Sequence, residues 1–557
     1  MSPSDVVGVL RAVDAEIAAG MAVAGFISYE AAAGIDAAFC VYEAGAFPLV
    51  WFGVYREPQM LAELPEVPDN VVVSESVASV DAADYADSIE RIKSYIAAGD
   101  TYQVNYTIRL RHAFSGDAYA FFRRLYYAQE TDYAAYVDIG DYAVCSVSPE
   151  LFFELRGSDI RMKPMKGTAR RGLTLEDDRR QAGMLRECGK NRAENVMIVD
   201  MVRNDLGRIA EPGSVRVASL FDVERYPAVW QMVSTVEART SAGLSELMGA
   251  LFPCASITGA PKVRTMEIIR ELESSPRGIY TGAIGYWLPE RQACFNVAIR
   301  TAVVDRKSAG MEYGVGGGIV WDSVEEHEFD ECLAKAEVLR SRPYVFELLE
   351  TLLWRPRQGF ELLERHLERM SKSAEYFGYV FERDDIVEML DKAVALESEA
   401  LRVRVLLARD GAARVESYPL DMRDDGRVRC VALMPDSVRS DDVFLYHKTT
   451  RREVYRTAAE AFPDADDVLL MNERGEVTES TVANLIVETG GVSYTPPLSS
   501  GLLPGTMRAE LLERGEISER VIMPDDLAAA DALWLINSVR GRMRVYLSEI
   551  PDAKNCR

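Results

Sequence analysis

At 557 residues the chain is too long for one hydrophobic core, and its length predicts roughly three to four domain-sized units. A composition of 48% hydrophobic and 9% aromatic residues is typical of a folded globular protein. The formal net charge of −25 argues against nucleic acid or an anionic membrane as the main partner. Lysines and arginines in unusual settings are therefore informative about small anionic ligands.

The eight cysteines are scattered without a Cys-x-x-Cys pair, and the four histidines form no local metal motif. This pattern indicates reduced thiols, not a disulfide framework or a zinc site. The apolar piece Met21–Ile27 is too short for a membrane helix and follows no basic segment, so we expect neither a signal peptide nor a membrane span. We expect a soluble, cytoplasmic protein.

Strands and helices alternate irregularly along the first half, which favours an α+β architecture over a doubly wound sheet. The predicted strands are Phe47–Tyr55, Tyr102–Ile108, the hairpin Ala134–Ile139 with Tyr142–Val147, and three runs between Ile279 and Ile319. The predicted helices are Asp84–Ala98, Ala118–Tyr127, Ala193–Leu206, Pro261–Leu272 and Glu325–Arg340.

The pattern changes after Ser341-Arg342-Pro343, so we place a boundary between a domain of residues 1–342 and one of residues 343–557. The second half begins with a predicted strand over Phe346–Trp354 and a helix from Leu362 to about Tyr376. A later apolar run, Val443–Tyr446, is predicted as a strand that leads into His447-Lys448.

Lys166 has an unusual setting, between Pro164 and the turn Gly167-Thr168, which suits neither a helix nor a run of solvated charge. It is a surface residue, a clamp for a phosphate or carboxylate, or a nucleophile. Composition alone favours the surface role.

Two carboxylates share one face of the predicted helix Glu325–Arg340. Glu328, Glu331 and Lys335 stand at positions i, i+3 and i+7. Such a face is either simply solvated or holds Mg²⁺, which prefers oxygen ligands. Glu194, near the start of another predicted helix, would be a third carboxylate, but spacing alone does not bring the three together.

Five motifs occur in order in the first half. They are Met165-Lys166-Gly167-Thr168, Glu194-Asn195-Val196-Met197-Ile198-Val199-Asp200 with Arg203-Asn204-Asp205, Ser256-Ile257-Thr258-Gly259-Ala260-Pro261-Lys262, Ala298-Ile299-Arg300-Thr301, and Gly316-Gly317-Gly318-Ile319 through Glu328-Phe329-Asp330-Glu331. Together they resemble the chorismate-utilising enzymes, which include anthranilate, isochorismate, salicylate and aminodeoxychorismate synthases. The resemblance spans residues 1 to about 340 and implies an antiparallel β-sandwich with surrounding helices.

The resemblance also implies roles for individual residues. Glu194 and Glu331 would bind Mg²⁺, with Glu328 supporting through water, and the metal would neutralise the ring carboxylate of chorismate. Arg300 and Tyr280 would hold the enolpyruvyl carboxylate. Further substrate contacts would come from Thr258, Gly259, the backbone N–H groups of Gly317 and Gly318, Lys335 and Gln103.

Lys166 distinguishes members of this family. Anthranilate-forming relatives typically have alanine there, whereas in aminodeoxychorismate-forming relatives a lysine attacks C2 of the ring. The resemblance implies that Lys166 attacks C2 as the C4 hydroxyl leaves, with Glu150 as general acid, and that ammonia then adds at C4 and expels the lysine. Attack requires a neutral amine, so burial and nearby Mg²⁺ should lower the pKa of Lys166. Without the resemblance, Glu150 is equally well an ordinary turn carboxylate.

Two glutamines also bear on the chemistry. Gln103 stands where isochorismate- and salicylate-forming relatives have a lysine base, and an amide cannot deprotonate water, so those activities are disfavoured. Gln231 stands where the wider family often has histidine, which is a departure among the residues beside C4.

The second half carries its own ordered motifs. They are Arg365-His366-Leu367-Glu368-Arg369, His447-Lys448-Thr449-Thr450-Arg451, Leu469-Leu470-Met471-Asn472-Glu473-Arg474-Gly475-Glu476-Val477-Thr478-Glu479-Ser480, Asn484-Leu485-Ile486-Val487, Tyr494-Thr495-Pro496-Pro497, and Gly501-Leu502-Leu503-Pro504-Gly505-Thr506-Met507-Arg508. Together they resemble the fold-type IV pyridoxal phosphate enzymes, among them branched-chain and D-amino-acid aminotransferases and aminodeoxychorismate lyase. The resemblance covers about 345–557 and implies a domain of two subdomains.

This second resemblance implies a cofactor site. Lys448, which in isolation is better explained as a surface charge, would bond covalently to pyridoxal phosphate and then carry protons. Glu479 would pair with the pyridine nitrogen, and Arg369 would hold the phosphate. Backbone N–H groups of Thr506 and Met507, where a helix is expected to begin, would also bind phosphate. Relatives often have threonine at the position of Met507.

The two resemblances together predict a bifunctional enzyme of the folate precursor pathway. It would aminate chorismate with ammonia to 4-amino-4-deoxychorismate and then eliminate pyruvate to give 4-aminobenzoate. Sequence separates lyase from aminotransferase poorly within fold type IV, and the expected product of the first half favours the lyase. The alternatives are anthranilate synthase component I fused to an aminotransferase-like domain, and a second half that is only a non-catalytic packing or dimerisation module.

The sequence has no Gly-x-Cys-x-Gly glutaminase motif with a downstream His-x-Glu. We therefore expect ammonia to come from a separate glutamine amidotransferase subunit. A homodimer through the second domain is a further expected assembly.

Overall fold

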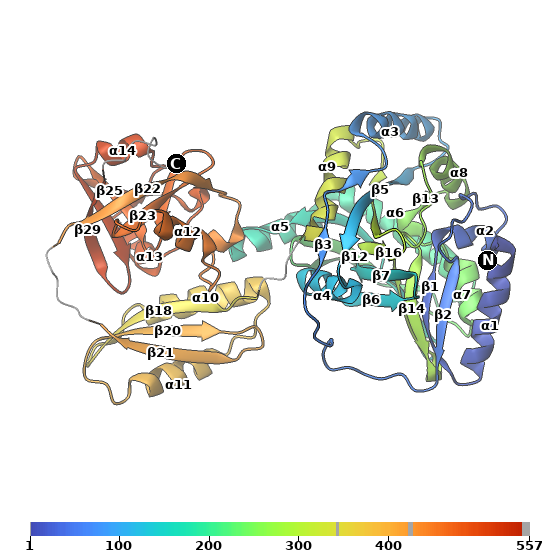
Figure 1. Cartoon of the computed structure of the whole chain (residues 1–557), viewed down its shortest axis with the longest axis horizontal. Helices are drawn as coiled ribbons and strands as arrows, with labels where there is room; N and C mark the ends of the chain where they lie inside the picture. The colour runs from blue at the N-terminus through green and yellow to red at the C-terminus, as the bar shows by residue number, and fades with distance from the viewer. Residues whose placement is uncertain (1, 341–344, 421–426, 549–557) are drawn as a thin grey trace. The chain divides into compact units, whose positions relative to one another are not determined.

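The computed structural model describes residues 2–340, 345–420 and 427–548, which fall into two compact units (Figure 1). The first unit comprises Met1–Arg171 and Gln181–Tyr344, and the second comprises Gly172–Arg180 and Val345–Arg557. The predicted boundary at residues 342 and 343 lies outside the described residues. No local pattern of residues indicates that Gly172–Arg180 belongs to the second unit.

Two sheets build the first unit. One consists of β1 (Ala22–Ile27), β2 (Val50–Tyr55), β8 (Leu151–Arg156), β9 (Asp159–Met162), β10 (Met165–Arg170), β11 (Arg216–Arg225), β12 (Val229–Arg239), β14 (Ala283–Leu288) and β15 (Gln292–Val297). The other consists of β3 (Val72–Val73), β4 (Val77–Ala78), β5 (Gln103–Ser115), β6 (Tyr133–Asp138), β7 (Tyr142–Ser148), β13 (Gly259–Ala260), β16 (Thr301–Asp305) and β17 (Gly310–Ile319). The strand order is β10-β12-β9-β8-β15-β14-β1-β2 in the first sheet and β13-β5-β17-β16-β7-β6 in the second.

The two sheets form an antiparallel sandwich. Phe26 of β1, Ile284 of β14 and Val144 of β7 share one buried cluster, which places the sheets face to face. Helices α1 (Val6–Ala18), α6 (Gly189–Gly207) and α7 (Leu244–Leu251) pack on the first sheet, and α3 (Ala82–Ala97), α4 (Ala118–Gln129), α8 (Lys262–Leu272) and α9 (Glu325–Ala336) pack on the second. The short helix α2 (Ala32–Ile35) follows β1, and α5 (Leu175–Glu187) precedes α6. The predicted α+β class and the sandwich with surrounding helices are confirmed.

Three predicted elements of the first unit differ in detail. Four strands, not three, lie between Ile279 and Ile319, because a turn at Pro289–Arg291 reverses the chain between β14 and β15. The helix predicted to reach Arg340 is α-helical only to Ala336 and ends as a 3₁₀ turn, Glu337–Arg340. The strand predicted over Tyr102–Ile108 is longer and extends to Ser115.

The second unit has two subdomains, each with its own hydrophobic core. The first subdomain consists of β18 (Leu348–Arg355), β19 (Gly359–Phe360), β20 (Leu401–Leu407) and β21 (Ala413–Pro419) with α10 (Leu363–Phe377) and α11 (Arg383–Val394). The second consists of β22 (Arg429–Val438), β23 (Asp467–Asn472), β24 (Val477–Ser480), β25 (Asn484–Thr489), β26 (Val492–Thr495), β27 (Ser518–Glu519), β28 (Ala532–Asn537) and β29 (Gly541–Leu547) with α12 (Glu453–Ala461), α13 (Thr506–Glu513) and α14 (Pro524–Ala528). The expected two-subdomain architecture is therefore present.

The strand predicted over Val443–Tyr446 is wrong, because Val443–Leu445 forms a 3₁₀ helix. The side chain of Asp442 accepts a hydrogen bond from the backbone N–H of Phe444 at 3.0 Å, which caps the turn. Within the described parts of the chain, no helix is both long and apolar enough to cross a lipid bilayer.

Candidate active sites

Lys166 lies in β10, at an irregularity in its pairing with β12. The side chain is partly buried, and Nζ donates a hydrogen bond to the backbone oxygen of Ser256 at 3.2 Å. Burial lowers the pKa of Lys166, and the nearby charges of Glu150 and Glu194 only partly oppose this. The lysine is therefore predisposed to lose its proton, as a nucleophile requires.

Glu150 follows β7 and is buried. The hydroxyl of Ser256 donates a hydrogen bond to its Oε1 at 2.6 Å. Burial raises the pKa of Glu150 to about 7, although the Ser256 hydroxyl and the charge of Lys166 act in the opposite direction. Ser256 thus contacts both the candidate nucleophile and the candidate acid, one through its carbonyl and the other through its hydroxyl.

Two glycines of β17 leave space where other predicted residues converge. A Cβ on Gly318 would lie 1.9 Å from Nε2 of Gln103 and 3.2 Å from Nζ of Lys166. A Cβ on Gly317 would lie 3.0 Å from Oε2 of Glu328. Any side chain at Gly318 would occupy the space in front of the lysine.

The predicted metal ligands come from two helices, Glu194 from α6 and Glu328 and Glu331 from α9. Burial raises the pKa of Glu328, and the charge of Glu331 adds to that effect. Glu331 pairs with Lys335 at 2.6 Å, and Lys335 also donates to the carbonyl of Gly316 at 2.8 Å. Among the described residues, no group of three His, Cys, Asp or Glu side chains is gathered closely enough to hold a metal ion.

The remaining predicted substrate-binding residues already form hydrogen bonds or packing contacts within the protein. The hydroxyl of Thr258 donates to the carbonyl of Cys254 at 3.1 Å, so it stabilises the local turn that contains it. Arg300 is partly buried and donates to the carbonyl of Lys335 at 3.1 Å. Tyr280 is buried against Gly314, where a Cβ would meet its ring at 2.2 Å.

Two more predicted positions have identifiable surroundings. Gln103 is buried, and its Oε1 has no hydrogen-bond partner among the described residues. Gly259 has φ +142°, and a Cβ there would lie 2.0 Å from the backbone oxygen of Gln103, so only glycine fits. Gln231, on β12, accepts a hydrogen bond from the Thr168 hydroxyl at 2.9 Å, which fixes it beside β10.

Sequence reasoning missed Ser256 as a functional residue. Its motif, Ser256-Ile257-Thr258-Gly259, predicts substrate contacts for Thr258 and Gly259 but none for the serine. Ser256 is buried at the 3₁₀ turn Ala255–Ile257, and nothing in the local pattern says that this turn faces Glu150 and Lys166. That contact is a product of the tertiary fold.

The second site is centred on Lys448, which follows the 3₁₀ turn Val443–Leu445 and is partly buried. The backbone N–H of Leu349 donates to the Lys448 carbonyl at 2.9 Å, so β18 helps to fix its backbone. Burial lowers the pKa of Lys448 to about 7, and the positive charges of Arg369 and Arg452 add to this effect. This lysine is therefore able to be neutral near neutral pH.

Glu479, on β24, is buried and held by three donors. The hydroxyl of Tyr455 donates to Oε1 at 2.8 Å, the N–H of Leu503 donates to Oε1 at 3.1 Å, and Nδ2 of Asn484 donates to Oε2 at 3.1 Å. Burial raises the pKa of Glu479 to about 7 in spite of these donors. Tyr455 lies outside the sequence motifs, and Asn484 begins one of them without a predicted role, so sequence reasoning missed both as supporting residues.

Arg369, on α10, forms a bidentate ion pair with Glu350 through bonds of 2.8 and 2.7 Å. It also donates a hydrogen bond to the carbonyl of Pro504 at 3.0 Å. Burial would raise the pKa of Glu350, but the charges of Arg369 and His366 outweigh it and lower that pKa to about 2. Within the described part of the chain, these bonds use three of the five N–H groups of the arginine, which leaves two for a ligand. Arg369 is thus anchored to the loop that begins α13.

The start of α13 has the geometry expected of a phosphate site. Gly505 is its N-cap, and Thr506 and Met507 are its first residues. A Cβ on Gly505 would lie 1.9 Å from Oδ1 of Asn484, so the loop is held tightly against the residue that also contacts Glu479. Free backbone N–H groups at a helix start favour anions.

A sandwich that sets a lysine beside a buried carboxyl group, followed by a mixed sheet with a second lysine and an anion-binding helix start, defines a two-domain enzyme. Residues 4–341 match the family model described as chorismate binding enzyme, and residues 347–546 match the one described as amino-transferase class IV. The first match covers more than half of the chain, so the chain belongs to the chorismate binding enzyme family, with a class IV aminotransferase domain after it.

Individual relatives agree with this assignment. The chain is 40% identical over 286 residues to aminodeoxychorismate synthase component 1 of Bacillus subtilis, and 44% identical over 260 residues to that of Klebsiella aerogenes. These alignments cover 50% and 46% of this chain and 60% and 57% of the relatives, so the chain spans little more than half the length of the curated relatives it matches. The fold is similar to that of anthranilate synthase component I from Streptococcus pneumoniae, with a TM-score of 0.51 and 25% identity over 58% of this chain and 81% of that one.

Proposed function

We propose that this chain makes 4-aminobenzoate from chorismate in two steps, an amination in the first unit and an elimination of pyruvate in the second. The observation that carries the first step is the Lys166–Ser256–Glu150 arrangement, in which burial favours the neutral form of both ionisable groups. The names of the relatives and the class IV domain support the order of the two steps.

In the amination, the neutral Lys166 amine attacks C2 of the ring while the C4–oxygen bond breaks. Glu150 gives its proton to the leaving hydroxyl, which departs as water. Ammonia then forms a bond to C4, the double bonds shift back, and the C2–nitrogen bond to Lys166 breaks. Lys166 leaves as a neutral amine, the new C4 ammonium returns a proton to Glu150, and the product is 4-amino-4-deoxychorismate.

Among the described residues the carboxylates of Glu194, Glu328 and Glu331 are not gathered closely enough to hold an ion by themselves, but they supply the oxygen ligands that Mg²⁺ prefers, and that ion completes its shell with waters and substrate. These residues would hold the ion, which would neutralise the ring carboxylate of chorismate. Arg300 and Tyr280 would orient the enolpyruvyl carboxylate, and the glycines of β17 leave room for the ring.

In the second unit, the donor set fits pyridoxal phosphate. Lys448 would hold the cofactor, Glu479 would pair with its pyridine nitrogen, and Arg369 with the start of α13 would hold its phosphate. When bound, the cofactor supplies an electron sink. Lys448 would remove the C4 proton of the aminated ring, the C3–oxygen bond would break, and pyruvate would leave as the ring becomes aromatic.

The test is incubation of the full chain with chorismate, Mg²⁺, ammonium and pyridoxal phosphate. We expect 4-aminobenzoate and pyruvate in equal amounts. Lys166→Ala should abolish both, whereas Lys448→Ala should lose the visible absorption of the lysine-bound cofactor and accumulate the aminated ring. Anthranilate as product, with activity kept in Lys166→Ala, would establish the anthranilate alternative instead.

A wild-type chain that accumulates the aminated ring and shows no visible absorption with pyridoxal phosphate would support a non-catalytic second unit. Ammonia from a separate glutamine amidotransferase subunit belongs to the same proposal, since the named relatives are called component 1. Glutamine should then replace ammonium only when such a subunit is added.

A further inference from the structure

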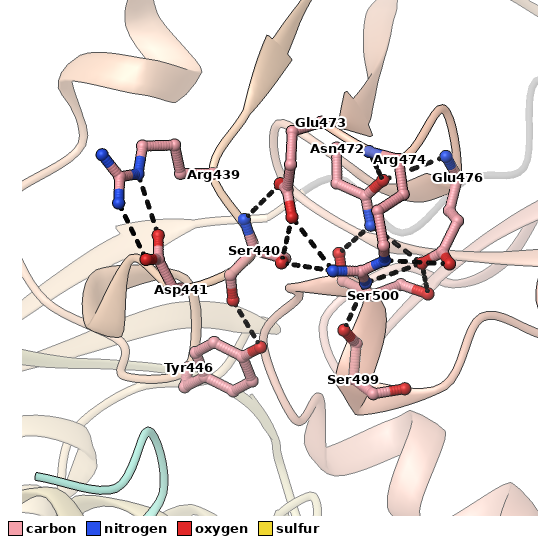
Figure 2. A network of polar contacts seen from close by, with 10 residues as sticks. All are labelled: Arg439, Ser440, Asp441, Tyr446, Asn472, Glu473, Arg474, Glu476, Ser499 and Ser500. Atoms are coloured by element: carbon pink, nitrogen blue, oxygen red, sulfur yellow. Dashed lines mark hydrogen bonds and ion pairs between the residues drawn. The ribbon is translucent and has the colours of Figure 1, made fainter. Parts of the chain in front are cut away.

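A network of polar side chains joins three loops of the second unit. We call it the Arg474 cluster, and its members are Ser440, Asn472, Glu473, Arg474, Glu476 and Ser500 (Figure 2). The loops are far apart in sequence: one precedes Lys448, one joins β23 to β24, and one precedes α13. No residue of the cluster has a role in the proposed chemistry, so its arrangement needs another explanation.

The first loop is tied at Ser440. Its N–H donates to Oε2 of Glu473 at 2.8 Å, and its hydroxyl donates to Oε1 of the same residue at 2.6 Å. The hydroxyl of Tyr446 donates to the Ser440 carbonyl at 2.8 Å, which closes the loop on itself. Lys448 follows Tyr446 by two residues, so these bonds hold the backbone from which the lysine projects.

The second and third loops are tied by Arg474. Its guanidinium binds both carboxylate oxygens of Glu476, with bonds of 3.1 and 2.8 Å. It also donates to the hydroxyl of Ser440 at 2.6 Å and to the carbonyl of Ser499 at 2.7 Å. Ser500 donates from its hydroxyl to Glu476 at 2.8 Å. Arg474 therefore contacts all three loops at once, as Figure 2 shows.

Two further contacts make this junction tight. Nδ2 of Asn472 bridges Oε2 of Glu476 at 2.8 Å and the carbonyl of Ser500 at 2.9 Å. Gly501 has φ +89°, and a Cβ there would lie 2.9 Å from Cα of Ser440, so the third loop lies directly against the first. Asn472 and Ser500 are buried, so the exposed Arg474 side chain is held against residues that are themselves fixed by packing.

Each loop leads to a different part of the cofactor site. Glu479 follows Glu476 by three residues, and Leu503, whose N–H binds Glu479, follows Ser500 by three residues. Thr506, the first residue of α13, lies three residues further on. The relative positions of lysine, carboxylate and phosphate loop thus depend on the junction that Arg474 makes.

We infer that Arg474 is a positioning residue, which sets the distance of Lys448 from Glu479 and from the start of α13 by holding their three loops together. The inference rests on the proposed cofactor site of the second unit. An exposed ion pair contributes little to global stability, and the Arg474 side chain is 44% exposed, so its effect should fall on the site and not on the fold. Active sites of this kind need geometry fixed by their supporting residues.

The experiment titrates the cofactor-free full chain with pyridoxal phosphate and follows the visible absorption. Arg474→Met should weaken cofactor binding about tenfold, equivalent to about 1.4 kcal/mol. The pH midpoint for the rate at which the band forms should also move upward, because a loosened site admits water and restores the pKa of Lys448 toward its ordinary value. Arg474→Lys should not rescue either property, since an ammonium group cannot form the bidentate contact with Glu476.

Arg439→Met is the matched control, because Arg439 pairs with Asp441 within the first loop and binding should stay within about twofold of wild type. The amination by the first unit should be unchanged in every variant. If Arg474→Met unfolds, Glu476→Gln keeps the size of its partner and should weaken binding in the same direction. Normal binding and an unmoved pH midpoint in Arg474→Met would overturn the inference, whereas a wild-type chain that takes no pyridoxal phosphate would overturn the cofactor site itself.

Discussion

At the scale of single residues, Lys166 and Glu150 form a pair whose uncharged forms are both favoured by burial. The proposed amination needs a protonated Glu150 and a neutral Lys166 at the same time. Groups this close titrate as a pair, so the pH profile of the reaction reports on both. The pKa of Glu150, about 7, sets the alkaline side of that profile, because a carboxyl group loses its proton as pH rises through its pKa.

The hydroxyl of Ser256 gives a way to move this limit. It donates to the Glu150 carboxylate and so stabilises the charged form. Ser256→Ala should raise the pKa of Glu150 and shift the alkaline limb of the amination upward by about one pH unit, since a hydrogen bond to a charged group contributes roughly 1.5–3 kcal/mol. The neighbouring groups Lys166, Cys254 and Tyr226 are retained in that variant.

The measurement is the rate of chorismate amination against pH with saturating ammonium. Ser256→Thr keeps the hydroxyl and should keep the wild-type limb. An unmoved limb in Ser256→Ala would mean that Glu150 is not the acid, and Glu150→Gln, expected to lose about 10²–10⁴-fold in rate, checks the same point.

At the scale of elements, the glycine-rich end of β17 determines what fits before Lys166. Gly318→Ala would bring a Cβ to 1.9 Å from Gln103 Nε2 and 3.2 Å from Lys166 Nζ, so both side chains must shift. A displacement of about 1 Å at reacting groups costs roughly 100-fold in rate, and we expect a loss of that size in amination. Elimination of pyruvate from supplied 4-amino-4-deoxychorismate should be unaffected.

Gly310→Ala is the control on the same strand. Its Cβ would meet the flexible hydroxyl of Ser308 at 3.0 Å, far along β17 from Lys166. Amination near the wild-type rate in Gly318→Ala would show that this end of the strand does not line the substrate site.

The elements also show which features the sequence could predict. Long periodic helices such as α3 and α10 were predicted within a few residues, because one apolar stripe decides both the helix and its packing. The run Val443–Leu445 was mistaken for a strand, because its apolar residues carry no period and the cap from Asp442 is a single side-chain contact. Short segments are settled by such contacts, not by propensity.

In the candidate sites too, the sequence predicts some residues, whereas others depend on contacts that only the fold creates. Motifs predict Lys166, Glu479 and Arg369, the residues to which the proposed chemistry assigns roles. The same motifs include Ser256 and Asn484 but predict no role for them, because each acts through a neighbour brought close only by the fold. The attachment of Gly172–Arg180 to the second unit is likewise a tertiary property with no local signal.

At the scale of the whole molecule, the first unit contains a buried charge network centred on Glu273, whose charged residues have no role assigned in the proposed chemistry. Glu273 accepts hydrogen bonds from Arg277 at 2.6 Å and Arg109 at 3.2 Å, and all three side chains are at most 2% exposed. It also accepts from the N–H and hydroxyl of Thr107 on β5. One carboxylate therefore joins α8, β5 and the turn before β14.

Glu273→Gln should destabilise the first unit by about 3–5 kcal/mol, because it leaves two buried guanidinium groups without their countercharge. The cofactor band of the second unit should persist, since that unit has separate hydrophobic cores. Unfolding in denaturant, followed by near-ultraviolet circular dichroism and by the cofactor band, separates the two effects. Arg111→Gln, which removes an exposed pair with Glu312 on the same strand, is the control and should change stability little.

The same unfolding measurement, repeated at acid pH, tests whether the charge of Glu273 stabilises the first unit. Burial acts to raise the pKa of Glu273, but the charges of Arg277 and Arg109 outweigh it, so its folded-state pKa lies below the ordinary 4.5. A depressed carboxyl pKa stabilises the folded state above the unfolded pKa, and this stabilisation is lost as pH falls through the folded pKa. The stability difference between wild type and Glu273→Gln should therefore be full at pH 7 and shrink below about pH 4.5. A difference that stays constant into acid would show that packing, not the charge of Glu273, holds these elements together.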